Sequence, residues 1–111
     1  MNAKFFKNIT VGEAQELSAL VQYAEGQVVS RTLVQNEHVS VTLFAFDRGE
    51  EIGTHSAAGD AFVYILDGMA DITVGETTSK VNKHQAILMP ADIPHSLLAR
   101  ERFKMMLIIV R

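Results

Sequence analysis

The stretch Gly49-Glu-Glu-Ile-Gly-Thr-His55-Ser-Ala57-Ala-Gly-Asp-Ala61-Phe-Val-Tyr-Ile-Leu-Asp-Gly68 contains the residues that decide the fold. Its second half, residues 61–66, is a short apolar block rich in β-branched and aromatic side chains, which is typical of a strand. Asp67-Gly68 follows at once, and this pair favours a turn because Asp bonds its own backbone and Gly tolerates positive φ. The stretch therefore predicts a strand that ends in a turn.

The same pattern continues on both sides of this stretch, from about Gln27 to the end of the chain. Strands are expected at residues 27–34, 39–46, 61–66, 70–74, 78–82, 86–89, 95–99 and 103–110. Short strands at this spacing, with no long helix between them, favour an antiparallel sandwich or barrel and argue against parallel βαβ units. The fold class predicted from the residues is all-β.

Residues 1–26 are expected to form an N-terminal arm, and residues 27–111 a single barrel domain, because no linker rich in Pro, Gly or Ser divides the chain. Within the arm, Ala14, Leu17 and Leu20 or Val21 recur at helical intervals, which predicts a short helix within residues 13–22.

Composition excludes several classes of protein. The chain has 111 residues, 48% apolar and 21% charged, which is ordinary globular usage and not that of a disordered chain. It lacks cysteine, so disulfides, thiolate metal sites and a cysteine nucleophile are excluded. The net charge of −3 comes from scattered residues without a basic stripe, which argues against nucleic acid as a partner. No apolar run is long enough for a membrane span or a signal peptide, so we expect a cytoplasmic protein with no membrane partner.

The stretch from Gly49 to Gly68 resembles the first motif of the cupin family, a Gly, five residues, His-x-His, three or four residues, Glu, six residues and Gly. A second stretch, His84-Gln-Ala-Ile-Leu-Met-Pro90-Ala-Asp92-Ile-Pro94-His95, resembles the second cupin motif. The resemblance covers about residues 39–110. It implies a cupin barrel of the RmlC-like jelly-roll type, commonly dimeric, in which many members bind a divalent metal.

The resemblance assigns the metal positions residue by residue. His55 stands at the first ligand position and His95 at the last, whereas Ala57 and Ala61 stand where the family has its second His and its Glu. Because residues 55, 57, 61 and 63 share parity along a strand, His55, Ala57, Ala61, Val63 and His95 are expected to line a pocket inside the barrel.

Two imidazoles without a carboxylate fall short of the usual three protein ligands of a catalytic zinc or iron site. The expected cofactor is therefore a divalent transition metal, zinc, nickel, iron or manganese, that is weakly held or absent. Asp60 is the nearest substitute ligand, but it lies one residue out of register with His55 and would need a bulge to turn inward. Without metal, the two rings would hydrogen-bond a small carboxylate or carbonyl compound.

The residues leave three functions open. The first is a small-molecule binding module with a weakly held metal, the second is a metal-dependent isomerase or dioxygenase acting on a small acid or sugar-like substrate, and the third is a purely structural dimer module. A homodimer is expected because residues 61–66 and 105–110 are apolar on both faces, and the edge at residues 27–34 could add to a partner's sheet. His38 and His84, both in expected turns, are interpreted as structural.

Overall fold

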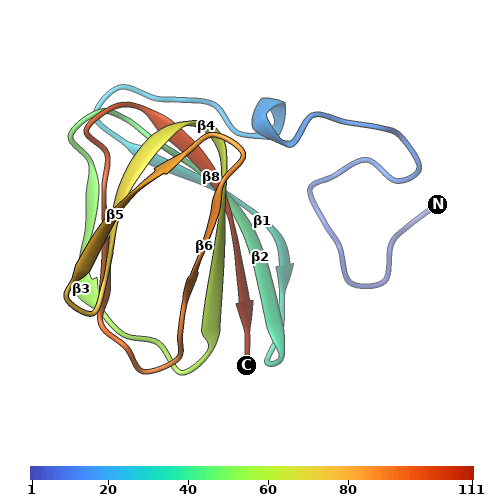
Figure 1. Ribbon diagram of the computed structural model, residues 1–111. Coiled ribbons are helices and arrows are strands. Elements are labelled where there is room, and N and C mark those ends of the chain that lie inside the picture. Colours follow the sequence, from blue (N-terminus) through green and yellow to red (C-terminus); the bar gives the residue numbers. More distant parts are fainter.

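The computed structural model describes residues 1–111 and contains eight antiparallel strands curled into a barrel (Figure 1). The strands are β1 (Val28–Gln35), β2 (Val39–Phe46), β3 (Glu51–His55), β4 (Asp60–Val74), β5 (Thr77–Asn82), β6 (Ala86–Met89), β7 (His95–Leu98) and β8 (Phe103–Val110). Sheet A has the order β1-β2-β8-β4-β6, and sheet B has the order β3-β7-β4-β5. The prediction of an all-β antiparallel barrel is confirmed.

Strand β4 belongs to both sheets, and here the sequence prediction was wrong in detail. Residues 61–66 and 70–74 are parts of one strand, and Asp67-Gly68 lies inside it instead of reversing the chain. The pairing with β8 shifts between Ile65 and Asp67, and Gly68 has φ 72°. A Cβ at Gly68 would lie 2.0 Å from the carbonyl oxygen of Arg102, so only glycine fits this bend. The Asp-Gly pair therefore marks the point where β4 passes from sheet A to sheet B.

Two other elements differ from expectation. Strand β3 was not predicted, because Glu51, Gly53 and Thr54 give it almost no apolar alternation. The helix expected within residues 13–22 is reduced to one 3₁₀ turn, η1 (Leu17–Leu20), which begins without a side-chain cap at Glu16. No helix of the structure is long and apolar enough to cross a membrane.

The inner faces of both sheets form the main core. Its largest fully buried side chains include Phe46, Ile65, Ile72 and Phe103, and the rings of Phe46 and Phe103 stack with centroids 4.5 Å apart. The core fills the barrel between the sheets, so residues on both inner faces stabilise the fold by burying apolar surface in a close-packed interior.

A second, smaller core lies on the outer face of sheet A, beneath the N-terminal arm. Leu33, Leu43 and Ala45 of β1 and β2 are buried there with Val21 of the arm. The Tyr23 hydroxyl donates to the Asp67 carboxylate at 2.6 Å, and the Lys104 ammonium donates to the Ser18 carbonyl at 2.6 Å. Burial, and next the bond to Asp67, raise the pKa of Tyr23 well above its ordinary value. The arm is thus attached both by packing and by specific polar contacts such as these two.

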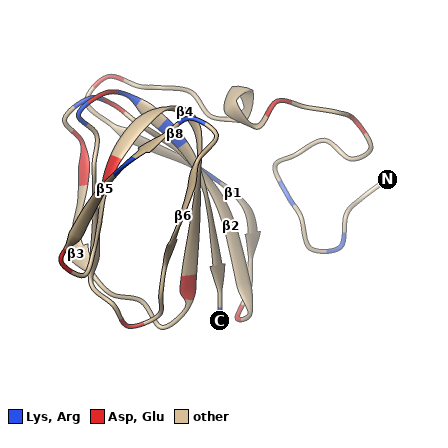
Figure 2. Cartoon of the chain, viewed as in Figure 1, with Lys and Arg blue, Asp and Glu red and all other residues tan.

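The arm also reaches the edge of sheet A. The Lys7 backbone N–H donates to the Leu33 carbonyl of β1 at 2.9 Å, and the Asn8 side-chain amide donates to the Thr32 carbonyl at 2.8 Å. These bonds occupy part of the edge at which another strand could pair. Charged residues are scattered over the chain and form no continuous basic stripe (Figure 2).

Candidate functional site

A bulge in β3 places the two histidines of interest opposite each other. Ile52 pairs with Leu97 and His55 pairs with His95, so Gly53 and Thr54 together stand opposite the single residue Ser96. One extra residue reverses the side-chain alternation of a strand. The bulge therefore returns His55 to the inner face, which Ile52 and His95 share, and it turns Thr54 to the outer face beside Ser96.

The His55 and His95 rings meet at the end of β3. Their Nε2 atoms are 3.1 Å apart, and the ring centroids are 4.2 Å apart with the planes inclined by 69°. His95 is buried at 4% exposure, whereas His55 is exposed. The structure brings these two imidazoles together, and the pair is open to solvent on the His55 side.

Each ring is held by a backbone carbonyl two residues earlier in the chain. His55 Nδ1 lies 3.0 Å from the Gly53 carbonyl oxygen, and His95 Nδ1 lies 3.2 Å from the Ile93 carbonyl oxygen. A carbonyl oxygen only accepts, so each contact is a hydrogen bond when Nδ1 carries the proton. A neutral imidazole has one ring proton, so both Nε2 lone pairs are then bare and face each other. In that tautomeric state, a cation between the two Nε2 atoms, either a shared proton or a metal ion, would satisfy both lone pairs.

Electrostatics limit how many protons the pair holds. Burial, and to a lesser extent the neighbouring His55, lower the pKa of His95, and the bond to the Ile93 carbonyl only partly opposes this. A positive charge on the buried His95 ring is therefore disfavoured.

The other residues assigned to the pocket lie elsewhere. Strand β3 ends at His55, so Ala57 belongs to the loop before β4 and the argument from one shared strand was wrong. Ala57 is half-buried, and its carbonyl accepts the Asp92 N–H at 2.8 Å. Ala61 and Val63 are buried in the main core. No cavity of the structure is lined by these residues, and a pocket inside the barrel stays a prediction.

Asp60 has a different contact from the one considered for it. Its Oδ1 accepts the Ala91 backbone N–H at 2.8 Å, which ties the start of β4 to the loop that leads to His95. No third His, Asp or Glu is placed to complete a metal-binding group with the two rings.

The remaining histidines are remote from the pair. His84 Nδ1 lies 3.1 Å from the Tyr64 hydroxyl, in a turn where His84 has φ 70°. His38 is exposed beside Glu37, with 3.3 Å between Nε2 and the carboxylate.

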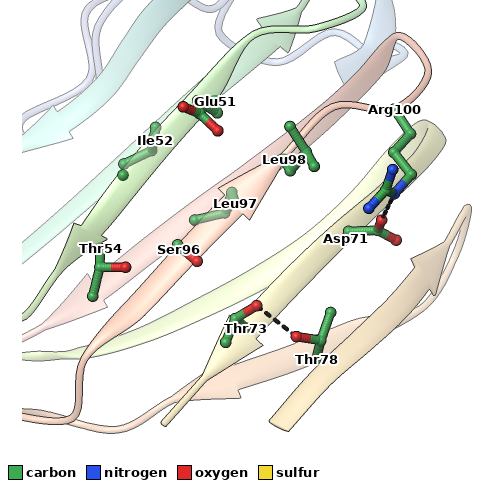
Figure 3. A pocket seen from close by; sticks show the side chains of 11 residues that line it. Glu51, Ile52, Thr54, Asp71, Thr73, Thr78, Ser96, Leu97, Leu98 and Arg100 are labelled. Atoms are coloured by element: carbon green, nitrogen blue, oxygen red, sulfur yellow. Dashed lines mark hydrogen bonds and ion pairs between the residues drawn. The ribbon is translucent and has the colours of Figure 1, made fainter. Parts of the chain in front are cut away.

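The sequence prediction missed a polar groove of about 420 Å³ on the outer face of sheet B. Figure 3 shows its side chains on β3, β7, β4 and β5, with Arg100 of the loop after β7 paired to Asp71. The residues that line the groove include Glu51, Thr54, Asp71, Thr73, Thr78, Ser96, Leu98 and Arg100. The alternation of Asp71, Ile72 and Thr73 in an expected strand was the available signal, since it places polar side chains on the face away from the core.

Several known proteins are similar to this chain. A family model described as a cupin domain matches residues 42–111. A crystal structure of a conserved protein of unknown function from Streptococcus pyogenes is 43% identical, with TM-score 0.95, over 98% of this chain and 96% of that one. A cupin superfamily protein from Desulfitobacterium hafniense is 30% identical, with TM-score 0.90, over 95% of this chain and 96% of that one.

A sequence relative is described only as an uncharacterized protein of Streptomyces coelicolor. It is 31% identical over 62 residues, which are 56% of this chain and 59% of that protein, so the match spans less than two thirds of the relative. Of these three proteins, the one from Desulfitobacterium hafniense is described by its superfamily, and none is described by an activity.

Proposed function

This chain belongs to the cupin family, and from that premise we propose that it is a small-molecule binding module whose recognition element is the His55–His95 pair. The pair binds a divalent transition metal weakly, and a small carboxylate or carbonyl ligand completes the coordination from the solvent side.

One observation carries the proposal, namely that the two Nε2 atoms are 3.1 Å apart while both Nδ1 atoms face carbonyl oxygens. With metal–nitrogen bonds of about 2.0–2.1 Å, this separation corresponds to a ligand–metal–ligand angle of roughly 100°. That angle lies between the octahedral and tetrahedral values, so one ion fits both rings with little movement. His55 and His95 would hold the ion, and it would supply a Lewis acid for an oxygen ligand.

The two imidazole nitrogens favour some of the candidate metals over others. Two neutral imidazoles suit zinc and nickel, whereas manganese prefers oxygen ligands and iron sites usually add a carboxylate. With two protein ligands instead of three, affinity should be in the micromolar range or weaker. The exposed side of His55 leaves the remaining coordination positions to water or to a ligand.

Calorimetric titration with zinc and nickel chloride tests the proposal. The wild-type protein should bind one ion per chain. His55→Ala and His95→Ala should each lower the affinity at least tenfold. His38→Ala, which alters an exposed histidine outside the pair, is the matched control. Equal binding by all four proteins would overturn the proposal.

The alternative, a metal-dependent isomerase or dioxygenase on a small acid or sugar-like substrate, has no specific contact in its favour. A general acid–base role for the pair would need an orienting carboxylate within hydrogen-bond reach. The contacts of both Nδ1 atoms are backbone carbonyls instead.

We also propose that a second copy of the chain covers the uncovered part of the outer face of sheet A. Phe62 and Leu88 pair across β4 and β6 with exposures of 40% and 54%, and Val110 is 58% exposed on β8. Light scattering should give twice the chain mass, and Phe62→Asp should give the single-chain mass. Thr73→Asp, on the outer face of sheet B, should leave the mass unchanged; a wild-type monomer at micromolar concentration would contradict this proposal.

A further inference from the structure

The outer face of sheet B presents two ordered rows of side chains across four strands. Strand pairing places Thr78 beside Thr73 and Thr73 beside Ser96, and the bulge in β3 brings Thr54 next to Ser96. We name Thr54, Ser96, Thr73 and Thr78 the hydroxyl row. With strands about 4.8 Å apart, this row spans roughly 14 Å.

The neighbouring row is mostly charged, and it ends at Lys80 of β5, which pairs with Asp71. Asp71 pairs with Leu98, and Leu98 pairs with Glu51, so the two carboxylates flank one apolar side chain at a separation of roughly 10 Å. The Arg100 guanidinium is paired to Asp71. Figure 3 shows both carboxylates and the guanidinium on the same side of the sheet as the hydroxyl row.

Several polar groups of the groove are available to a ligand. Thr73 and Thr78 hydrogen-bond each other at 2.8 Å, and Asp71 is paired with Arg100. None of the side-chain hydrogen bonds or ion pairs of the structure involves Glu51, Thr54 or Ser96. A volume of about 420 Å³ falls within the range of small-molecule sites.

The chemistry of the lining narrows the class of ligand. The carboxylates of Glu51 and Asp71 are balanced by Arg100 and by Lys80, which pairs with Asp71, so this face has no excess of either charge and disfavours a strongly charged ligand. Leu98 is the one apolar side chain between the charges, which disfavours an apolar ligand. Hydroxyl groups both donate and accept, and carboxylates accept from neighbouring hydroxyls while guanidinium donates to them. A neutral polyhydroxylated molecule matches the whole set.

We propose that the groove on the outer face of sheet B is a second binding site, for a neutral saccharide of about two sugar units, distinct from the His55–His95 pair. Glu51 and Asp71 accept hydrogen bonds from sugar hydroxyls, Arg100 donates to a ring or hydroxyl oxygen, and the hydroxyl row follows the length of the ligand. The bulge in β3 serves both sites, because it directs His55 inward and Thr54 outward.

Amide chemical-shift mapping by NMR tests this site, with maltose, cellobiose and myo-inositol as the probes. At least one probe should give saturable shifts centred on Glu51, Asp71 and Ser96. Glu51→Gln removes the charge of an exposed carboxylate with little change of shape, and it should weaken that binding at least fivefold. Glu76→Gln, in the β4–β5 turn, is the matched control and should bind as the wild type does.

Further measurements distinguish this site from its alternatives. His95→Ala should retain the sugar-induced shifts, so failure here and failure of the proposed metal site are distinguishable. Sodium phosphate and magnesium chloride should give no saturable shifts in the groove. The proposal is overturned if no probe saturates there, if phosphate or magnesium binds there instead, or if Glu51→Gln binds the sugar as tightly as wild type.

Discussion

The outer faces of the two sheets differ, although their inner faces form one common core. Outside sheet A, Leu33, Leu43 and Ala45 are buried beneath the arm, and Phe62 and Leu88 stay exposed beyond it. The outside of sheet B carries hydroxyl and charged side chains in ordered rows instead. The same barrel therefore offers an apolar face suited to polypeptide and a polar face suited to small hydrated molecules.

This difference indicates which surfaces of the barrel can carry function. Inner-face residues are constrained by packing and resemble one another in both sheets. The outer faces, together with the barrel end at His55, are free to vary, and they carry all the interactions proposed here.

Truncating one leucine on each outer face should give the largest contrast. Leu43→Ala removes a fully buried side chain from the core beneath the arm and should lower the free energy of unfolding by about 2–5 kcal/mol. Leu98→Ala removes a half-buried side chain from the face of sheet B and should cost about 1 kcal/mol. Urea denaturation monitored by circular dichroism measures both; equal losses would contradict the comparison.

The strong elements of the fold could be predicted from sequence, and the weak ones could not. The apolar blocks of β2, β6 and β8 have the predicted bounds, because alternation and turn residues agree there. Strand β3 has no such pattern, and its pairing depends on β7, which a linear pattern does not reveal. The Asp67-Gly68 pair was misread because a turn and a bend both need the same positive φ.

The two histidines of the candidate site were named from the sequence, and their structural arrangement was not. His55 and His95 were found through the family motifs, and the structure brings their rings together. The bulge at Gly53 and Thr54, the carbonyl partners of Nδ1 and the placement of Ala57 in a loop depend on three-dimensional pairing. The groove was missed because its polar residues come from four strands that only the topology brings together.

A substitution that loosens the arm should lower the free energy of unfolding by an intermediate amount. Tyr23→Phe removes the hydroxyl that donates to the Asp67 carboxylate and keeps the ring that packs near Lys104. The loss of one hydrogen bond to a charged, partly buried group should cost about 1–3 kcal/mol. Urea denaturation measures it, with Tyr64→Phe as the control, since the Tyr64 hydroxyl contacts His84 in an exposed turn and not the arm. A loss no larger than that of Tyr64→Phe would show that the Tyr23–Asp67 hydrogen bond does not help to attach the arm.

The smallest effect is expected from acid. Asp47 accepts from the Gly26 N–H and the Arg102 guanidinium, and these contacts, led by the Gly26 bond, lower its pKa from 3.8 to about 2. Because the folded-state pKa is lowered, the stabilisation is complete above pH 3.8 and is lost as pH falls towards 2. Asp47→Asn should flatten this part of the stability–pH curve. An unchanged curve would mean that the carboxylate does not help to hold the arm's end against the barrel.

The central claim is that the Nε2 lone pairs of His55 and His95 converge and are satisfied by a cation. Two-bond proton–nitrogen NMR of the imidazoles, with His38 and His84 as internal references, tests this most directly. The account predicts that both rings of the pair carry a proton on Nδ1 at neutral pH and that zinc shifts both Nε2 resonances together. Nε2-protonated tautomers at both rings, or a zinc response confined to one of them, would contradict it.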